Sequence, residues 1–196
     1  MLRTAFISFI FLSFLQQVSA QDDWDAVKEI EKNIHAPVFK NKDYHITSSG
    51  SDARTAINNA IAKCSAQGGG RVIVPAGKYN IKGPLLLKSN VNLHFNEGAE
   101  LNFSSNADDY LPVVFTRWEG TELYNYSPLI YAYKASNIAV IGKGLLNGRG
   151  LDNFATWKPQ QKKDQQDLRE MGRTGVPVKQ RVFGKGHFLR RSQCFC

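Results

Sequence analysis

The chain has 196 residues, a net charge of +8 and a mean hydropathy of −0.33. This length predicts a single folded domain. Its three cysteines are too few for a disulfide scaffold, and their spacing matches no zinc site. We therefore exclude a disulfide-stapled or zinc-stapled miniprotein and expect neither a metal ion nor a cofactor.

The first twenty residues have the layout of a secretory signal peptide. Arg3 supplies a positive charge, residues 5–15 are an apolar run, and the small residues Val18, Ser19 and Ala20 suit cleavage. An uncleaved membrane anchor is the alternative, but the run is too short to span a bilayer. We predict a signal peptide at residues 1–20 and a secreted or periplasmic protein that leaves the membrane after cleavage.

Residues 21–50 are expected to form an N-terminal segment that leads into the domain. Within it, residues 25–33 read as an amphipathic helix and residues 44–47 as a strand. A second helix should begin at Ser51 or Asp52, which are good N-cap residues, and end at the three glycines 68–70. Its apolar stripe predicts that Cys64 is buried.

From Arg71 onward the apolar period changes from helical to two, which is typical of strands. The expected strands are residues 72–74, 79–81, 85–87, 91–95 and 99–103. The glycines and asparagines between them leave no room for helices. Short alternating strands separated by tight turns predict successive coils of a solenoid.

An internal repeat supports this prediction. Residues 85–101 and 131–146 share a strand, a Lys, a Ser-Asn turn, an alternating strand and a glycine turn. Their starts lie 46 residues apart, which fits two coils. Asn90 and Asn137 occupy equivalent turns, either as turn formers or as a stacked side-chain ladder. We predict an all-β, right-handed parallel β-helix with a short capping helix.

Two further segments differ in composition from the coils. Residues 104–128 are rich in aromatic residues, which form either one wall of a carbohydrate cleft or, for at least half of them, core packing. Residues 158–174 are polar without apolar periodicity and are expected to form a surface excursion, and residues 176–183 resemble a strand again.

Positive charge is concentrated near the C-terminus. Residues 158–191 contain ten lysines and arginines against three acids. Such a segment either steers a polyanion or is a solvated basic loop. For an exported protein we favour an acidic polysaccharide as the partner. We expect no nucleic acid, because the sequence contains no motif that recognises nucleic-acid bases.

The ordered motifs resemble those of secreted pectin-degrading enzymes. A helix followed by GGG precedes V-x-V-P-x-G-x-Y at residues 72–79 and G-P-L-x-L-K-S-N-V-x-L-x-x-x-x-G-A-x-L at residues 83–101. Residues 108–120, 126–132 and 137–150 also look like later elements of the same family. Together they resemble glycoside hydrolase family 28, the polygalacturonases, over roughly residues 52–188.

The resemblance implies a right-handed parallel β-helix that hydrolyses α-1,4-galacturonosyl bonds of pectin or polygalacturonate with inversion. It also implies that residues 51–196 are the N-terminal portion of a truncated hydrolase domain whose C-terminal coils are missing. A full-length protein would be a monomer. An inverting mechanism needs two carboxyl groups, one as acid and one to activate water.

The family draws its catalytic groups from N-x-D, D-D and G-H-G motifs, followed by R-x-K. Asp108-Asp109 is a D-D that comes too early, and Gly186-His187-Phe188 has no N-x-D before it. We therefore assign no catalytic residue, expect the catalytic site beyond Cys196, and predict that this chain alone is inactive.

Five residues are candidates for binding substrate: Arg117, Trp118, Glu119, His187 and Arg190. A Trp beside a cation and a carboxylate suits a sugar acid, through ring stacking and charge pairing. The alternatives are an Arg–Glu pair around a packed Trp and a structural His.

Two other functions are compatible with the sequence. One is a non-catalytic β-helix module that binds acidic polysaccharide. The other is a pectate-lyase-like β-helix, for which Asp108-Asp109 would have to bind calcium.

Overall fold

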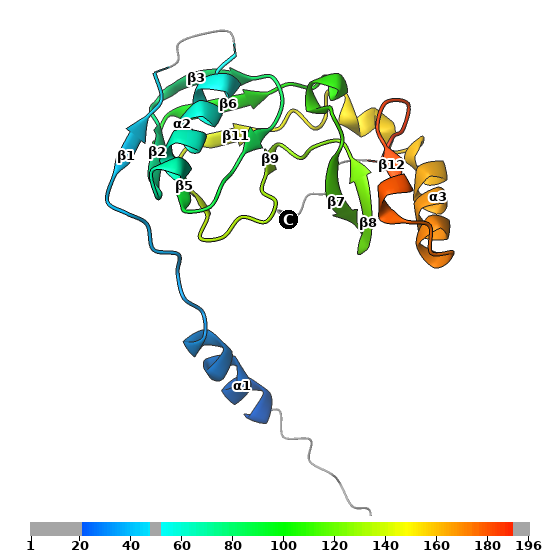
Figure 1. Ribbon diagram of the computed structural model, residues 1–196, viewed down its shortest axis with the longest axis horizontal. Helices are drawn as coiled ribbons and strands as arrows, with labels where there is room; N and C mark the ends of the chain where they lie inside the picture. The colour runs from blue at the N-terminus through cyan, green and yellow to red at the C-terminus, as the bar shows by residue number, and fades with distance from the viewer. Residues whose placement is uncertain (1–20, 48–51, 190–196) are drawn as a thin grey trace, which may run out of the picture. The chain divides into compact units, whose positions relative to one another are not determined.

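The computed structural model describes residues 21–47 and 52–189 and contains two compact units, residues 1–36 and 37–196 (Figure 1). The first unit contains α1 (Gln21–Lys32), which confirms the helix predicted at residues 25–33. The predicted signal peptide lies outside the described residues. Within the described ranges, no helix has the length and apolar character needed to cross a membrane.

The second unit consists mainly of short strands. They are β1 (Asp43–His45), β2 (Gly70–Val74), β3 (Gly77–Ile81), β4 (Leu85–Leu86), β5 (Val91–Phe95), β6 (Ala99–Phe103), β7 (Val114–Trp118), β8 (Thr121–Asn125), β9 (Ile130–Tyr131), β10 (Ala139–Gly142), β11 (Leu145–Asn147) and β12 (Val182–Phe183). The helices are α2 (Arg54–Ala66) and α3 (Gln161–Arg173), with 3-10 turns at Ala107–Tyr110, Phe154–Trp157 and Val178–Gln180.

Strands of successive coils pair in parallel. The sheets have the orders β1-β2-β5-β10, β11-β6-β3 and β4-β9, and all their pairings are parallel. Thus β2, β3 and β4 make one coil, β5, β6 and β9 the next, and β10 and β11 begin a third. The exception is the antiparallel hairpin β7–β8, which leaves the stack between β6 and β9.

The internal repeat corresponds to neighbouring coils, not to segments two coils apart as its length indicated. Leu85 of β4 pairs directly with Ile130 of β9, and Leu93 of β5 pairs with Val140 of β10. The additional length is the excursion of residues 104–129, which carries the hairpin. Sequence spacing alone cannot distinguish an extra coil from a long insertion within one coil.

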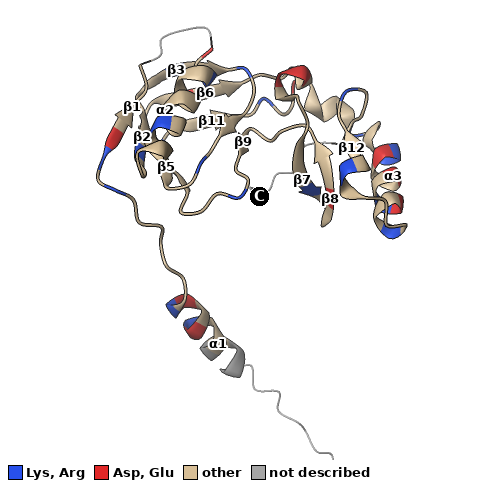
Figure 2. Cartoon of the chain, viewed as in Figure 1, with Lys and Arg blue, Asp and Glu red and all other residues tan. Residues whose placement is uncertain are grey.

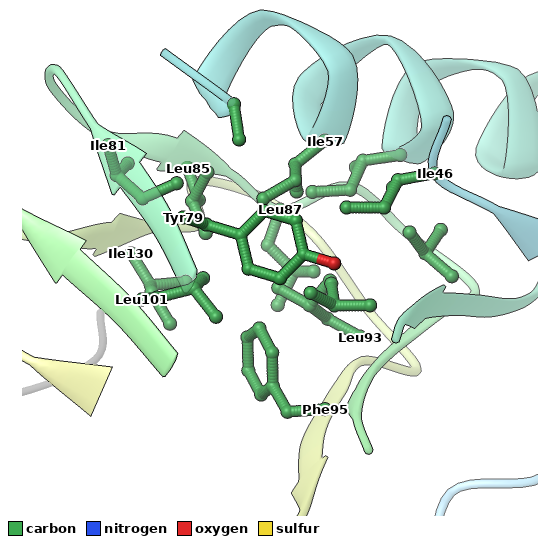
Figure 3. Packing of buried hydrophobic residues seen from close by; sticks show 14 of the residues in the cluster. Ile46, Ile57, Tyr79, Ile81, Leu85, Leu87, Leu93, Phe95, Leu101 and Ile130 are labelled. Carbon is green, nitrogen blue, oxygen red and sulfur yellow. The ribbon is translucent and has the colours of Figure 1, made fainter. Parts of the chain in front are cut away.

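The core lies inside the coils and consists of the inward-facing apolar residues of the alternating strands. Tyr79 and Leu101 pair in register, as do Val72 and Leu93, and all four are buried (Figure 3). Helix α2 packs on this core through Ile57, Ile61 and Cys64, as its apolar stripe predicted. Burial raises the pKa of the Cys64 thiol.

The turns of neighbouring coils are connected by a side-chain ladder. Asn137 donates from Nδ2 to Oδ1 of Asn90 over 3.1 Å, and both residues have positive φ, 52° and 65°. Asn90 and Asn137 are therefore both turn formers and members of a side-chain ladder. Gly69 lies against the same turn, where an added Cβ would come within 2.4 Å of the Asn90 carbonyl oxygen, so the glycine permits a close approach.

The structure corrects two predictions for the C-terminal region. Residues 158–174 do leave the coils, but they contain the 13-residue helix α3, so the domain is not all-β apart from its capping helix. Residues 176–183 form a 3-10 turn and only the two-residue strand β12, which pairs with β8 of the hairpin and not with a coil. Both segments therefore belong to the hairpin.

The coil register predicts how stability depends on position. Leu93 is fully buried between its neighbours, whereas Ile141 on the next strand is 48% exposed. We expect Leu93→Ala to lower the free energy of unfolding by about 2–5 kcal/mol, because it leaves a cavity in the core. Urea unfolding followed by circular dichroism measures this change.

The control is Ile141→Ala, which removes apolar atoms that are already half in water. We expect it to cost less than about 1 kcal/mol. Equal losses for the two variants would contradict the inward register of β5.

Candidate functional site

The hairpin and the C-terminal elements form a substructure with a small core of its own. Leu123 of β8, Leu168 of α3, Phe183 of β12 and Leu189 are buried together, with Trp118 packed against them. Strand β12 adds to the sheet in parallel with β8. Segments that lie about fifty residues apart in sequence are thereby brought side by side.

A basic pocket of about 580 Å³ lies where the hairpin turn meets α3. Its charged lining consists of Arg117, Arg169, Arg173 and Arg181, together with Glu122. Figure 2 shows that β7 carries a basic position and that basic and acidic positions alternate along α3. We call this the arginine pocket. With four guanidinium groups and one carboxylate in its lining, it suits an anionic ligand.

Three of these arginines are held by glutamates. Arg117 is 3.0 Å from Glu122, its cross-strand partner in the hairpin. Arg169 is 2.7 Å from Glu119, and Arg173 makes two hydrogen bonds to Glu170. The hydrogen bonds that Arg173 donates to the Glu170 carboxylate raise the pKa of Arg173. The side chains are thus oriented before any ligand arrives.

Arg181 is held differently. Its Nε donates to the Val176 carbonyl over 2.8 Å, and its Nη1 donates to the Glu122 carbonyl over 3.2 Å. Within the described part of the chain no carboxylate pairs with it. Its charge is therefore directed at the pocket without an internal counter-ion.

The sequence analysis singled out Arg117, Trp118 and Glu119, and these three residues lie at or beside the arginine pocket. Arg117 lines it. Trp118 is half-buried on the hairpin core, with the Arg169 guanidinium 5.7 Å from its ring centre. Trp118 thus lies between two ion pairs, Arg117–Glu122 and Arg169–Glu119, neither of which joins Arg117 to Glu119. Arg169, Arg173 and Arg181 could not be grouped with them from sequence patterns, because neither α3 nor the contact of residues 161–183 with the hairpin was predicted.

His187 lies outside the pocket lining. Its Nδ1 is 2.8 Å from Oδ1 of Asp164, and its ring packs against Phe183. Asp164 is buried on α3, and its Oδ2 also accepts the backbone N–H of Phe188 over 2.6 Å. His187 is thus fixed by a buried carboxylate. The remaining candidate, Arg190, lies outside the described residues.

The aromatic residues of the excursion mostly pack inward. Tyr110 and Tyr126 are buried, and Phe115, Trp118 and Tyr124 are half-buried. The exposed ring of this region is Tyr133, which stacks parallel to Tyr131 and contacts Phe115. The alternation Tyr-Ala-Tyr at residues 131–133 is the signal that could have identified it.

The acid pair Asp108-Asp109 is engaged in contacts with other side chains. Asp109 accepts a hydrogen bond from the Ser104 hydroxyl, and Asp108 is 3.7 Å from the Lys185 ammonium. Across residues 21–47 and 52–189, no three potential metal ligands lie together.

Stacked parallel coils that carry a charged side structure define the chain as a β-solenoid protein. It is similar to a hyperthermoactive exopolygalacturonase from Thermotoga maritima, with 38% identity and a TM-score of 0.78 over 85% of this chain and 41% of that one. No family model matches the chain.

Two curated proteins also match. The chain is 33% identical over 112 residues to an exo-poly-alpha-D-galacturonosidase of Dickeya chrysanthemi, covering 53% of the chain and 18% of that protein. It is 31% identical over 122 residues to the plasmin and fibronectin-binding protein A of Streptococcus pneumoniae, covering 56% and 17%. The chain therefore spans less than a fifth of these curated relatives.

The likenesses to the Thermotoga and Dickeya proteins confirm the resemblance predicted from the motifs. The chain resembles exopolygalacturonases in both sequence and structure.

The contacts of Asp164 predict its part in holding the side structure together. Asp164→Ala leaves the Phe188 N–H without its acceptor and releases His187, so we expect a loss of about 1–3 kcal/mol in unfolding free energy. Asp167→Ala, on the same helix, breaks only an exposed pair with Lys163 and should cost less than about 0.5 kcal/mol. Thermal unfolding compares them, and equal midpoints would show that Asp164 is dispensable.

Proposed function

We propose that this chain is part of an exported hydrolase that cleaves α-1,4-galacturonosyl bonds of polygalacturonate with inversion, and that the arginine pocket binds carboxylates of that polysaccharide. The observation that carries the proposal is the convergence of four arginines on one pocket of a polygalacturonase-like solenoid. Galacturonate units each present a carboxylate, and guanidinium groups pair with carboxylates through two parallel hydrogen bonds.

The glutamates that pair with these arginines leave other N–H donors of the guanidinium groups free to bind a ligand. A guanidinium has five N–H donors, and Arg117 uses one of them on Glu122 within hydrogen-bond distance. Arg169 likewise gives one nitrogen to Glu119. Open donors on oriented side chains can accept a ligand carboxylate without first ordering the side chain, which lowers the entropic cost of binding.

The proposal includes the handedness and the destination of the chain. Parallel strands joined by a crossover are right-handed in about 98% of cases, which supports a right-handed β-helix. The apolar run after Arg3 supports export through a signal peptide at residues 1–20. We assign no catalytic carboxyl pair to this chain.

A second candidate is a non-catalytic module that binds acidic polysaccharide. A non-catalytic role is favoured by the pneumococcal relative, whose name describes binding of plasmin and fibronectin and not hydrolysis. The choice of an acidic polysaccharide as ligand rests on the arginine pocket. Sequencing the gene past codon 196 separates the two. N-x-D, D-D, G-H-G and R-x-K downstream would support the hydrolase, and a stop without them would support the module.

Binding should depend on the pocket and not on net charge alone. We expect Arg117→Ala to weaken binding to polygalacturonate about three- to tenfold, because it removes a charged hydrogen-bond donor from the pocket. Affinity electrophoresis in gels containing polygalacturonate measures the retardation. Lys179→Ala is the matched control, since it removes one positive charge from an exposed residue outside the pocket lining. Equal effects of the two variants would argue against a pocket.

The chain alone should bind without cleaving. We expect no release of reducing ends from polygalacturonate above the blank, with or without a chelator, because no acid pair of the inverting type is assigned in it. A chelator-insensitive rate would mean that a complete catalytic site lies within these 196 residues. A chelator-sensitive rate would favour a lyase-type metal site.

A further inference from the structure

The outer face of the sheet β11-β6-β3 carries two aligned rows of polar side chains. Asn80, Asn102 and Asn147 pair in register across three successive coils. Lys82, Ser104 and Arg149 come two residues later, where each strand ends. Because side chains alternate along a strand, residues two apart face the same side. One row is therefore composed of amides and the other of cation, hydroxyl and cation.

A hollow of about 330 Å³ lies between these rows. It is lined by Asn80, Ile81, Lys82, Asn102, Ser104 and Arg149. We call it the ladder groove. None of its residues lines the arginine pocket. Neighbouring strands lie about 4.8 Å apart, so Lys82 and Arg149 stand at positions two strand spacings, or roughly 10 Å, from one another.

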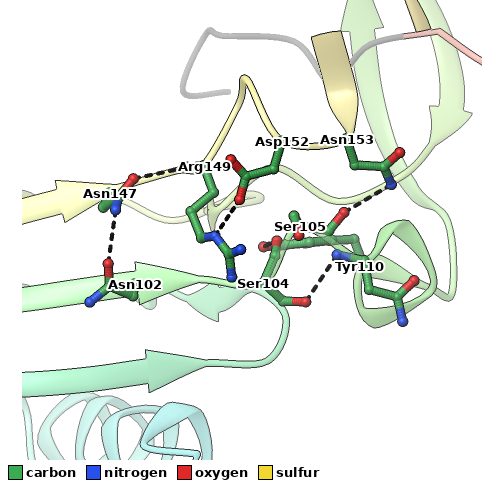
Figure 4. Close-up of polar contacts among 9 residues, drawn as sticks. Asn102, Ser104, Ser105, Tyr110, Asn147, Arg149, Asp152 and Asn153 are labelled. Atoms are coloured by element: carbon green, nitrogen blue, oxygen red, sulfur yellow. Dashed lines mark hydrogen bonds and ion pairs between the residues drawn. The ribbon is translucent and has the colours of Figure 1, made fainter. Parts of the chain in front are cut away.

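Hydrogen bonds orient one end of the ladder groove. The Arg149 backbone N–H donates to Oδ1 of Asn147, whose Nδ2 donates to Oδ1 of Asn102 over 2.9 Å (Figure 4). Asn102 in turn donates to Glu100 over 2.9 Å, and this bond lowers the pKa of the Glu100 carboxyl. The Arg149 guanidinium is 2.6 Å from Asp152. The amide planes at this end are thus fixed.

At the other end, two polar side chains of the described residues remain unpaired. The side-chain amide of Asn80 and the ammonium of Lys82 have no hydrogen-bond or ion-pair partner among the residues that the structure describes. Four acids lie nearby. Glu100 is 3.5 Å from Lys78, Asp152 pairs with Arg149, and Asp109 accepts the Ser104 hydroxyl. Asp52 accepts the backbone N–H of Lys82 and pairs with Arg54. Among the described residues the Lys82 ammonium itself therefore has no carboxylate partner.

We propose that the ladder groove is a second binding site for an acidic oligosaccharide, separate from the arginine pocket. Lys82 pairs with a sugar carboxylate, and the amides of Asn80 and Asn102 hydrogen-bond with sugar hydroxyls. The spacing of the two cations exceeds one sugar ring, so the ligand spans at least two units and crosses the strands. The choice of an acidic sugar rests on the proposed function, whereas the groove itself does not.

Two attachment points on one solenoid have a consequence for a polymeric ligand. A chain held at one site experiences a raised effective concentration at the other, so the polymer binds more tightly than an oligomer that reaches only one site. The groove would then retain polysaccharide on the coils while another part of it occupies the pocket.

The test uses the full chain labelled with ¹⁵N and titrated with trigalacturonate. The side-chain amide signals of Asn80 and Asn102 should shift on addition of trigalacturonate and not with an uncharged trisaccharide. Lys82→Ala should raise the dissociation constant read from these signals about three- to tenfold, because the variant loses a charge-assisted contact. Asn80→Ala should also raise it.

Lys78→Ala is the matched control. Lys78 is an exposed lysine on β3, two residues before Asn80; it pairs with Glu100 and does not line the groove. We expect less than about a twofold effect, since an exposed pair contributes little. Equal effects of Lys78→Ala and Lys82→Ala, or amide signals that do not move, would overturn the proposal.

Arg117→Ala distinguishes this proposal from the proposed function. If this variant leaves binding in the groove unchanged and weakens binding at the pocket, the two sites are independent, as we propose. Shifts confined to residues of the arginine pocket would support the proposed function and contradict binding in the ladder groove. Shifts confined to the groove in the unaltered chain would remove the pocket and leave the groove.

Discussion

No coil of this protein can bury its own apolar side chains, and the rest of the structure depends on that constraint. Leu93 is covered because Val72 and Val140 pair with it on either side. Burying a Leu in this way stabilises the fold by about 1.5–3 kcal/mol, but only if neighbouring strands keep their register. The same register aligns the outward residues, so the asparagine row over three coils follows from the packing inside.

The register of the coils also determines where the two excursions leave the stacked coils. The hairpin excursion leaves after β6, and the α3 excursion leaves after β11, which is the strand that pairs with β6. Both excursions therefore start from the same corner of adjacent coils and meet one another. Their contact is secured by a separate small core around Leu123 and Leu168. The arginine pocket can thus vary in sequence without disturbing the register of the coils.

The sequence predicted the elements whose side chains are sorted by polarity. Strands β5 and β6 and helix α2 were predicted because their buried residues are apolar and regularly spaced. Helix α3 was missed because its buried face consists of Gln161, Asp164 and Leu168, and so lacks an apolar stripe. Ion pairs such as Arg173–Glu170 support it from outside. The pocket was missed in turn, since the Arg169–Glu119 contact joins residues fifty positions apart.

The arginine pocket is better explained by binding than by folding. The pairs Arg117–Glu122, Arg169–Glu119 and Arg173–Glu170 lie at the surface, where an ion pair contributes about 0–1 kcal/mol to stability. Of the four arginines, Arg181 also stabilises the fold, because it donates hydrogen bonds to the backbone carbonyls of both Val176 and Glu122. Arginines that add little to the fold nevertheless converge on one hollow, where four guanidinium groups against three glutamates leave a net positive charge. Such a field attracts a polyanion from a distance and is screened by salt, so the affinity for polygalacturonate should fall as ionic strength rises.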